Sequence, residues 1–252
     1  MKDMKQALSE LERQLKESDS FIYSYFIRHR NRFINDADIV KQYYKHGTIL
    51  DIGCFPCHFT ILLKKLNFPV IGIDLKMDRC VPFIKRFDLC IKKCDIEKEP
   101  LPFADKSISF IIFNEVFEHL HKDPLFTLSE INRVMIKNGI LLFTTPNLYA
   151  IHKIFRFLTG HSFNDALVEL SKLRFTGHMG HFREYAPSEI RKLLEMHCFR
   201  VREVNYRHYS YFNSLRGVVG WFIYRLSPPW FRTYHVIVAE KVSDCSVLTS
   251  LP

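Results

Sequence analysis

Between residues 48 and 144, short apolar runs alternate with segments of helical periodicity, and this alternation limits the possible folds more than any other feature of the chain. The runs are rich in Ile, Leu, Val and Phe, which is typical of strands buried on both faces of a sheet. Strands that alternate with helices indicate an α/β fold with a mainly parallel sheet and right-handed crossovers. The strands are predicted at 48–52, 70–74, 89–94, 108–113 and 139–144, and helices at 59–66 and 126–136.

The segments on either side of this alternation extend the domain. Leu8, Leu11 and Leu15 recur at helical spacing within 4–17, and 21–45 continues as helix. Further along the chain we expect a helix at 188–198 and two closing strands at 199–205 and 234–239. The predicted organisation is an N-terminal helical extension over 1–46, a main domain over 47–242 with substrate or lid insertions at 148–186 and 205–233, and a tail at 243–252.

The composition bears on partners and compartment. The chain has 36 Lys+Arg against 27 Asp+Glu, a formal net charge of +9, which favours phospholipid headgroups, phosphorylated substrates or nucleic acid as partners. Seven cysteines is an odd number, and Cys54 and Cys57 form a lone C-x-x-C, so we expect reduced thiols in a cytoplasmic protein. No run of the sequence approaches the ~18 apolar residues that a membrane span requires.

Acidic residues follow three of the predicted strands, at the edge where α/β sheets bind ligands. The first strand ends at Asp51, and Gly53 allows a tight turn and close backbone approach before the next helix. The second strand ends at Asp74, where a carboxylate is well placed to accept the hydroxyls of a ribose. Asp95 follows the third strand, placed to accept from the exocyclic amine of adenine, with Ile96 packing on the ring.

Six motifs that occur in order resemble those of class I S-adenosylmethionine-dependent methyltransferases, over roughly residues 47–200. The resemblance implies a Rossmann-like, mainly parallel seven-stranded sheet with helices on both faces, and S-adenosylmethionine as the cofactor. The motifs are Thr48–Gly53, Val70–Asp74, Cys94-Asp95, Leu101–Asp105, Asn114–Leu120 and Gly139–Asn147. The implied cofactor contacts are Asp51, Gly53, Phe55, Asp74, Leu75, Asp95, Ile96 and Asn114.

The glycine loop departs from the family pattern, because Phe55 and Cys57 stand where the family usually has glycines. Phe55 precedes Pro56, which favours an extended backbone, so its ring points either away from the cofactor or over it. One interpretation is a rigid variant loop that still binds S-adenosylmethionine. The alternative is a loop that has lost binding, in a non-catalytic protein that keeps the fold.

Three candidate catalytic residues follow the strand predicted at 108–113. Glu115, Glu118 and His119 would share one face if they lie on a helical turn, and two carboxylates with an imidazole make a plausible half-site for a divalent metal. A further histidine would come from His178 or His181 in the segment before the next helix. In the alternative without a metal, Glu115 only contacts the cofactor, and His119 is a general base or a helix-packing residue.

This arrangement resembles two methyltransferase families, the ubiquinone-biosynthesis O-methyltransferases and the small-RNA 3′-terminal 2′-O-methyltransferases. In the RNA family, four such side chains hold a metal that binds vicinal hydroxyls. The resemblance implies that Glu115, His119 and His181 act in catalysis, and that the same residues with Glu118 hold Mg²⁺, Mn²⁺ or Zn²⁺. Such a metal would lower the pKa of the acceptor hydroxyl and orient it.

The segment 181–190 resembles a turn and helix in methyltransferases of glycan and lipid-carrier pathways, which implies a hydroxyl on a small molecule, sugar or lipid-linked glycan as acceptor. Between Asn205 and Tyr234 there is no Asp or Glu, while Arg and aromatic residues are frequent. Such a segment suits an anionic membrane surface, which would make the protein peripheral to the membrane. The alternatives are a hydrophobic lid or dimer surface, and an RNA-binding face in an RNA methyltransferase.

Overall fold

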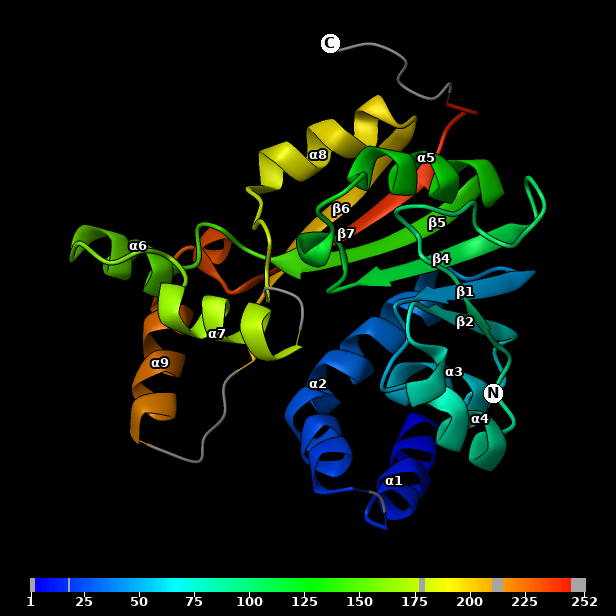
Figure 1. The fold of residues 1–252 in the computed structure, drawn as a ribbon, viewed down its shortest axis with the longest axis horizontal. Coiled ribbons are helices and arrows are strands. Elements are labelled where there is room, and N and C mark those ends of the chain that lie inside the picture. The colour runs from blue at the N-terminus through cyan, green and yellow to red at the C-terminus, as the bar shows by residue number, and fades with distance from the viewer. Residues whose placement is uncertain (1–2, 18, 177–179, 210–214, 246–252) are drawn as a thin grey trace.

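A single seven-stranded sheet lies at the centre of the computed structural model, which describes residues 3–17, 19–176, 180–209 and 215–245 (Figure 1). The strand order is β3-β2-β1-β4-β5-β7-β6. The first five strands pair in parallel, and β7 runs antiparallel to both β5 and β6, which confirms the predicted mainly parallel sheet. The strands are β1 Thr48–Ile52, β2 Val70–Asp74, β3 Ile91–Lys93, β4 Ile108–Asn114, β5 Met135–Pro146, β6 Phe199–Arg207 and β7 Tyr234–Lys241.

Helices cover both faces of the sheet, as predicted (Figure 1). On one face, the buried side chains of four helices share a core with β1 and β4; these helices are α1 Met4–Leu15, α2 Ser20–Tyr43, α3 His58–Lys65 and α4 Val81–Phe87. On the other face, α5 Pro124–Val134 and α8 Pro187–Met196 form a second core with Phe113, Leu141 and Ile237. The predicted leucine stripe of α1 is buried in the first core, so the N-terminal helices pack on the same face of the sheet as α3 and α4.

Two predicted boundaries are wrong for an identifiable reason. The helix predicted over 126–136 ends at Val134, because Met135 pairs with Ile108 and so begins β5. The third strand is also shorter than the predicted 89–94, since only Ile91–Lys93 pairs with β2. The prediction also lacked α4 and three helices beyond β5.

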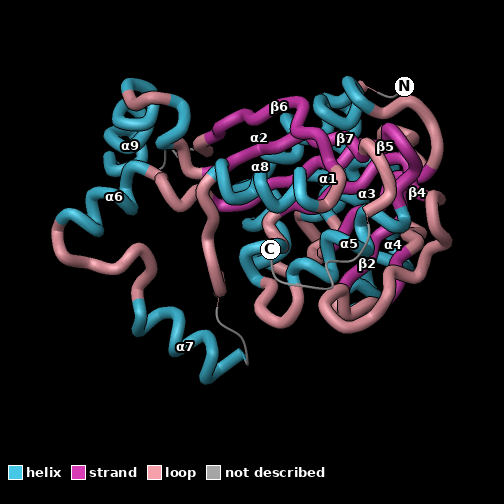
Figure 2. Tube along the Cα trace, turned by 90° about the horizontal axis from the view of Figure 1, so that it is seen from above, coloured by secondary structure: helices cyan, strands magenta, loops and turns pink. Residues whose placement is uncertain are grey.

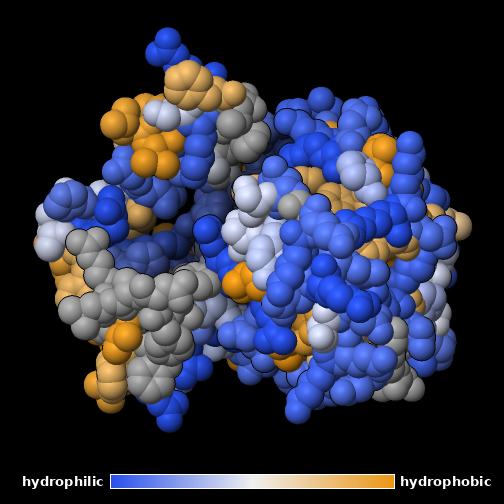
Figure 3. Space-filling model, turned by 90° about the horizontal axis from the view of Figure 1, so that it is seen from below, coloured by the Kyte–Doolittle hydropathy of each residue, from blue (hydrophilic) through white to orange (hydrophobic). Residues whose placement is uncertain are grey.

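Those three helices project from the sheet as an arm, made of α6 Ile151–Leu158, α7 Ala166–Thr176 and α9 Leu215–Leu226 (Figure 2). Many apolar side chains of the arm are exposed, and Figure 3 shows them gathered on that side of the molecule. No helix among the described residues is both long and apolar enough to cross a membrane. The exposed apolar residues of the arm are Phe155, Phe157, Leu158, Leu167, Val168, Leu170, Leu173, Phe175, Phe222, Ile223 and Leu226.

Candidate active site

The loop after β1 turns sharply at Gly53, whose φ of +71° lies in the left-handed region. The backbone N–H groups of Gly53 and Cys54 both donate to the carbonyl of Ile73, at 2.9 and 3.1 Å, which ties the loop to β2. A Cβ atom at position 53 would lie 2.5 Å from a methyl group of Val116. Glycine is therefore required here on two counts, the backbone angle and the space.

Asp74, at the end of β2, organises the rest of the loop. Its carboxylate accepts the N–H of Phe55 at 3.1 Å and the N–H of Lys76 at 2.9 Å, and burial raises its pKa. The ring of Phe55 lies 3.8 Å from the guanidinium of Arg79, a cation–π contact that gives the unusual side chain a partner. The variant loop is thus tied to β2 through its backbone, and through the Phe55 side chain to the 3₁₀ turn Met77–Cys80 that follows β2.

Asp51 is buried at the end of β1 and accepts a hydrogen bond from the Thr60 hydroxyl at 2.6 Å. Burial raises its pKa to about 7, an effect that the bond from Thr60 and the charge of Arg32 oppose. Asp95 and Leu75 follow β3 and β2 on the same edge of the sheet. The Asp95 carboxylate lies 3.3 Å from Lys98 Nζ, and Ile96 packs against the second core.

A first cavity opens beside this loop, between α2 and the ends of β1 and β4. Because the sequence predicts cofactor binding at this loop, we call the cavity the cofactor pocket. The predicted residues Asp74, Leu75, Asp95 and Ile96 lie outside its lining. The contribution of α2 was not predicted from the sequence, although the i, i+7, i+8 spacing of Tyr25, Arg32 and Phe33 places them on one helical face. The lining residues are Tyr25, Arg32, Phe33, Asp51, Gly53, Cys54, Phe55, Pro56, His58, Phe59, Asn114 and Glu115.

Glu115 begins the candidate catalytic turn, with a φ of +57° that is strained for a residue other than glycine. Its N–H donates to the Thr144 carbonyl at 2.9 Å, and its carboxylate accepts the Thr144 hydroxyl at 3.0 Å. Burial raises the pKa of Glu115, while the positive charge of Arg32 opposes that effect. The turn continues as a short 3₁₀ helix over Phe117–His119 and not as the α-helical turn that the spacing suggested.

The structure brings Glu118, His119 and His181 together, with one ligand atom from each lying within 4.8 Å of the others. Glu118 is fully buried, and its Oε2 accepts the Thr145 hydroxyl at 3.0 Å. Its Oε1 has no hydrogen-bond partner among the described residues and lies 3.9 Å from His119 Nε2. Burial and the charge of Glu115 raise the pKa of Glu118 well above its ordinary value.

The two histidines of this Glu/His cluster are oriented through their Nδ1 atoms. His119 Nδ1 contacts the Gly180 carbonyl, and His181 Nδ1 lies 2.9 Å from the carboxylate of Glu184. Such contacts fix the ring and direct Nε2 toward a metal or substrate. Glu115 is not part of the cluster and faces the cofactor pocket instead. His178, the other predicted histidine, lies outside the described residues.

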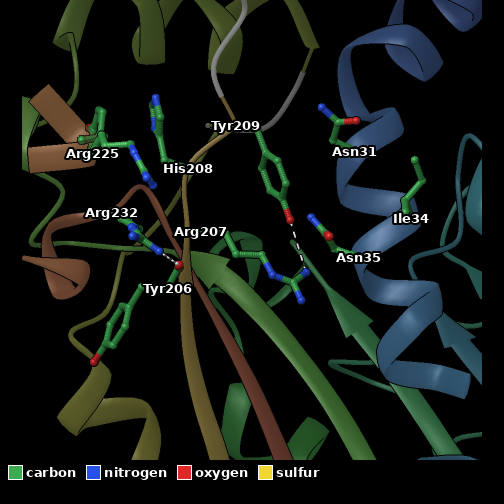
Figure 4. A pocket seen from close by; sticks show the side chains of 10 residues that line it. Asn31, Ile34, Asn35, Tyr206, Arg207, His208, Tyr209, Arg225 and Arg232 are labelled. Carbon is green, nitrogen blue, oxygen red and sulfur yellow. Dashed lines mark hydrogen bonds between the residues drawn. The ribbon is translucent and has the colours of Figure 1, made fainter. Parts of the chain in front are cut away.

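A second cavity, of about 440 Å³, lies between α2, the end of β6 and α9 (Figure 4). We call it the basic pocket, because three arginines and a histidine line it with three tyrosines. Arg207 Nη1 lies 2.8 Å from the Asp36 carboxylate and donates to the Tyr209 hydroxyl at 3.3 Å. The lining residues are Asn31, Ile34, Asn35, Tyr206, Arg207, His208, Tyr209, Tyr224, Arg225 and Arg232.

Asp36 joins the two cavities. Its carboxylate accepts from Arg207 of the basic pocket and from the Asn114 side-chain amide of the cofactor pocket, at 2.8 and 3.1 Å. The side chain is fully buried, and burial raises its pKa to about 6 against the opposing charges of Arg207 and Arg32. One buried carboxylate thus links a lining residue of each cavity.

A family model described as a methyltransferase domain matches residues 6–216. A methyltransferase from Archaeoglobus fulgidus, described as dependent on S-adenosylmethionine, superposes with a TM-score of 0.62 at 18% identity, covering 88% of this chain and all of that one. A putative methyltransferase of Haloferax volcanii, solved in complex with the activator Trm112, gives 0.59 at 14% identity over 93% and 98% of the two chains. These likenesses show the fold. No curated protein matches the sequence significantly.

Proposed function

The chain belongs to the methyltransferase-domain family and is an S-adenosylmethionine-dependent methyltransferase, and on this premise we propose that its acceptor is a hydroxyl group on a small or lipid-linked molecule. The observation that carries the proposal is the Glu/His cluster beside the cofactor pocket. The cofactor, when bound, supplies an activated methyl group on sulfur. The protein must then align the acceptor oxygen with that group and help to remove its proton.

We assign cofactor binding to the ends of β1, β2, β3 and β4, with the methionine part in the cofactor pocket and the adenosine outside that pocket, toward β2 and β3. Asp74 keeps its carboxylate at the loop where it can accept ribose hydroxyls, and Asp95 and Ile96 are placed for the adenine. Arg32 of α2 lies in the cofactor pocket, where it is suited to pair with the carboxylate of the methionine part. Gly53 and Phe55 form the loop between these groups, and Asn114 and Glu115 close its far side.

The Glu/His cluster is suited to activate the acceptor hydroxyl. His119 is partly exposed, and its ring is held through Nδ1, so it can take a proton from an acceptor oxygen as a general base. His181, oriented by Glu184, is placed to position the same oxygen. His119 contacts the Gly180 carbonyl, and the Gly180 N–H donates to Glu169 of α7 at 2.7 Å, so the cluster lies beside the arm and the acceptor would enter between the arm and the sheet.

A divalent metal is the second candidate for this step, and the orphaned oxygen of Glu118 favours it. A buried carboxylate oxygen without a partner costs free energy, which a bound cation would recover. Glu118, His119 and His181 would hold Mg²⁺, Mn²⁺ or Zn²⁺, and the cation would lower the pKa of a hydroxyl bound to it. Glu115 is left out of this ligand set and kept as a cofactor-side residue.

Binding of Mn²⁺ to the purified protein tests the metal directly, without knowledge of the acceptor. We expect one Mn²⁺ per chain, measured by loss of the free-ion electron paramagnetic resonance signal, and a loss of affinity of at least about tenfold in Glu118→Gln. Glu99→Gln, an exposed carboxylate elsewhere, is the matched control and should bind as the wild type does. Equal binding by Glu118→Gln would reject the metal and leave His119 as the base.

Two features support a lipid-linked acceptor that carries a phosphate. The basic pocket offers arginines and tyrosines suited to a phosphate or a sugar. The arm exposes a series of apolar side chains beside that pocket, and Figure 3 shows a hydrophilic hollow between the arm and the rest of the molecule. The phosphorylated headgroup of such a lipid would lie in the hydrophilic hollow, and its apolar chain would contact the exposed apolar side chains of the arm.

Transfer of labelled methyl from S-adenosylmethionine into a total lipid extract, with total RNA as a parallel substrate, tests the acceptor class. We expect label in the organic phase that survives mild alkali, because a methyl ether is stable where a methyl ester is not. Label that alkali removes would point to a carboxyl acceptor. Label confined to RNA would contradict the proposal and favour the RNA methyltransferase alternative.

A further inference from the structure

Three cysteines meet beneath the cofactor loop. Cys54 and Cys57 belong to the loop after β1, and Cys80 ends the short 3₁₀ helix Met77–Cys80 that follows β2. All three are buried, with exposed fractions of 6%, 0% and 0%, and their sulfur atoms lie within 4.8 Å of one another. The sequence showed only the pair Cys54–Cys57, because Cys80 is brought in by the fold from 23 residues away.

The surrounding backbone makes room for these sulfurs. The N–H of Cys57 donates to the carbonyl of Cys54 at 2.6 Å, which closes the turn and keeps the two residues together. On the neighbouring strand, a Cβ atom at Gly72 would lie 2.8 Å from Cys54 Sγ. The space that Gly72 leaves is therefore occupied by a sulfur atom. None of the three thiols has a role in the methyl transfer proposed above.

We propose that Cys54, Cys57 and Cys80 bind one zinc ion through their three sulfur atoms. Zinc–sulfur bonds of about 2.3 Å place two sulfurs of a tetrahedral site roughly 3.8 Å apart. Sulfur atoms that already lie within 4.8 Å need to move only slightly to reach that geometry. Each thiol gives up its proton as its sulfur binds the ion, so no oxidant or reductant is needed.

The charge of the neighbourhood favours a dication over a monovalent soft metal. Three thiolates carry three negative charges, and a dication leaves one, whereas Cu⁺ would leave two. The carboxyl groups of Asp51 and Asp74 lie at the ends of the two adjacent strands, where additional negative charge is costly. The Arg79 guanidinium, one residue before Cys80, adds a nearby positive charge. Cys54 also lines the cofactor pocket, which gives water a route to the fourth position.

Zinc at this site would fasten together the two segments that hold the cofactor. The loop 53–57 and the turn 77–80 are already linked by the Arg79–Phe55 contact, on either side of Asp74. The ion would add a bond between them in a loop that carries Phe55 and Cys57 in place of small residues. The site is separate from the Glu/His cluster, and it stands whatever the acceptor proves to be.

Metal content and the cobalt spectrum of the full chain test the site. The protein, reduced and equilibrated with Zn²⁺, is freed of unbound ion and analysed by mass spectrometry of the element. Because the Glu/His cluster could also take zinc, the count is made in Glu118→Gln: we expect one zinc per chain there and in Glu118→Gln/Cys90→Ser, whose exposed cysteine serves as control, and at least about tenfold weaker zinc binding in Glu118→Gln/Cys80→Ser. Glu118→Gln should keep the zinc, which separates this site from the Glu/His cluster.

Cobalt substitution in the wild type needs no variant and so does not depend on whether Cys80→Ser folds. Co²⁺ should give intense sulfur-to-metal charge-transfer absorption, which oxygen and nitrogen ligands do not produce. The proposal is overturned if reduced Glu118→Gln binds no zinc, if cobalt shows no sulfur band, or if Glu118→Gln/Cys80→Ser binds zinc as tightly as Glu118→Gln. It is also overturned if the cysteines are recovered as a Cys54–Cys57 disulfide that zinc does not prevent.

Discussion

Two residues near the cofactor pocket, Glu115 and Asp36, adopt a backbone angle or a degree of burial that ordinarily costs free energy. Glu115 has a left-handed backbone, and Asp36 is a fully buried carboxyl group between two cavities. Strain and buried charge of this kind persist where the surrounding structure fixes them, and they concentrate at functional sites. Arg32 is the common neighbour, since its charge acts on both carboxyl groups.

The raised pKa of Asp51 has a measurable consequence for the stability of the protein. Its pKa is near 3.8 in an unfolded chain and about 7 when folded, so between those values the folded protein binds more protons than the unfolded one. The contribution of Asp51 to stability is therefore full at low pH and is lost as the pH rises toward about 7. In urea unfolding, the free energy of unfolding of Asp51→Asn should fall less steeply than that of the wild type over this range. The two proteins should be closest in stability at low pH. Equal slopes of the free energy of unfolding against pH would contradict a raised pKa at Asp51.

At the scale of elements, the sequence was most informative where periodicity and burial agree. The five parallel strands and the leucine stripe of α1 could be predicted because each pattern reports one buried face. The arm could not, since α7 does not separate polar from apolar residues, and α6, although amphipathic, exposes Phe155, Phe157 and Leu158 while it buries Lys153. The acidic strand ends were also predictable, because parallel strands end at one edge. The place of Glu115, in the lining of the cofactor pocket and outside the Glu/His cluster, was one of two alternatives that the sequence left open, and spacing could not decide between them because a left-handed residue breaks helical spacing.

The arm carries a prediction of its own, that it binds an anionic membrane surface. Phe157 and Leu158 at the end of α6 are exposed by 63% and 72%, and burying such side chains in a bilayer contributes ~1–2 kcal/mol each. In flotation with vesicles containing phosphatidylserine, we expect the wild type to float and the double variant Phe157→Ser/Leu158→Ser to float several-fold less. Wild-type protein that stays at the bottom of the gradient would rule out membrane docking. Equal flotation of the variant would place the contact elsewhere.

At the scale of the whole molecule, α2 separates two cavities and contributes to both. Arg32 and Phe33 line the cofactor pocket, while Asn31 and Asn35 line the basic pocket. The sequence indicated a helix here but not which of its faces meets the sheet. That orientation depends on contacts of α2 with residues of β6, such as Asp36 with Arg207, which are more than 150 positions apart in the sequence. The predicted domain limits, 1–46 and 47–242, remain a prediction. Because α1 and α2 share a hydrophobic core with the sheet, a cut between residues 46 and 47 would expose that core.

Isothermal titration of the folded wild-type chain with S-adenosylmethionine tests the central claim most directly, because every later step requires the cofactor to bind beside Phe55. We predict one cofactor per chain with a dissociation constant in the roughly micromolar range. Arg32→Ala should weaken binding by about tenfold or more, equivalent to ~1.4 kcal/mol, while the exposed Arg28→Ala on the same helix should match the wild type. A folded wild-type protein that shows no binding would contradict the account and identify the Phe55–Cys57 loop as one that has lost the cofactor.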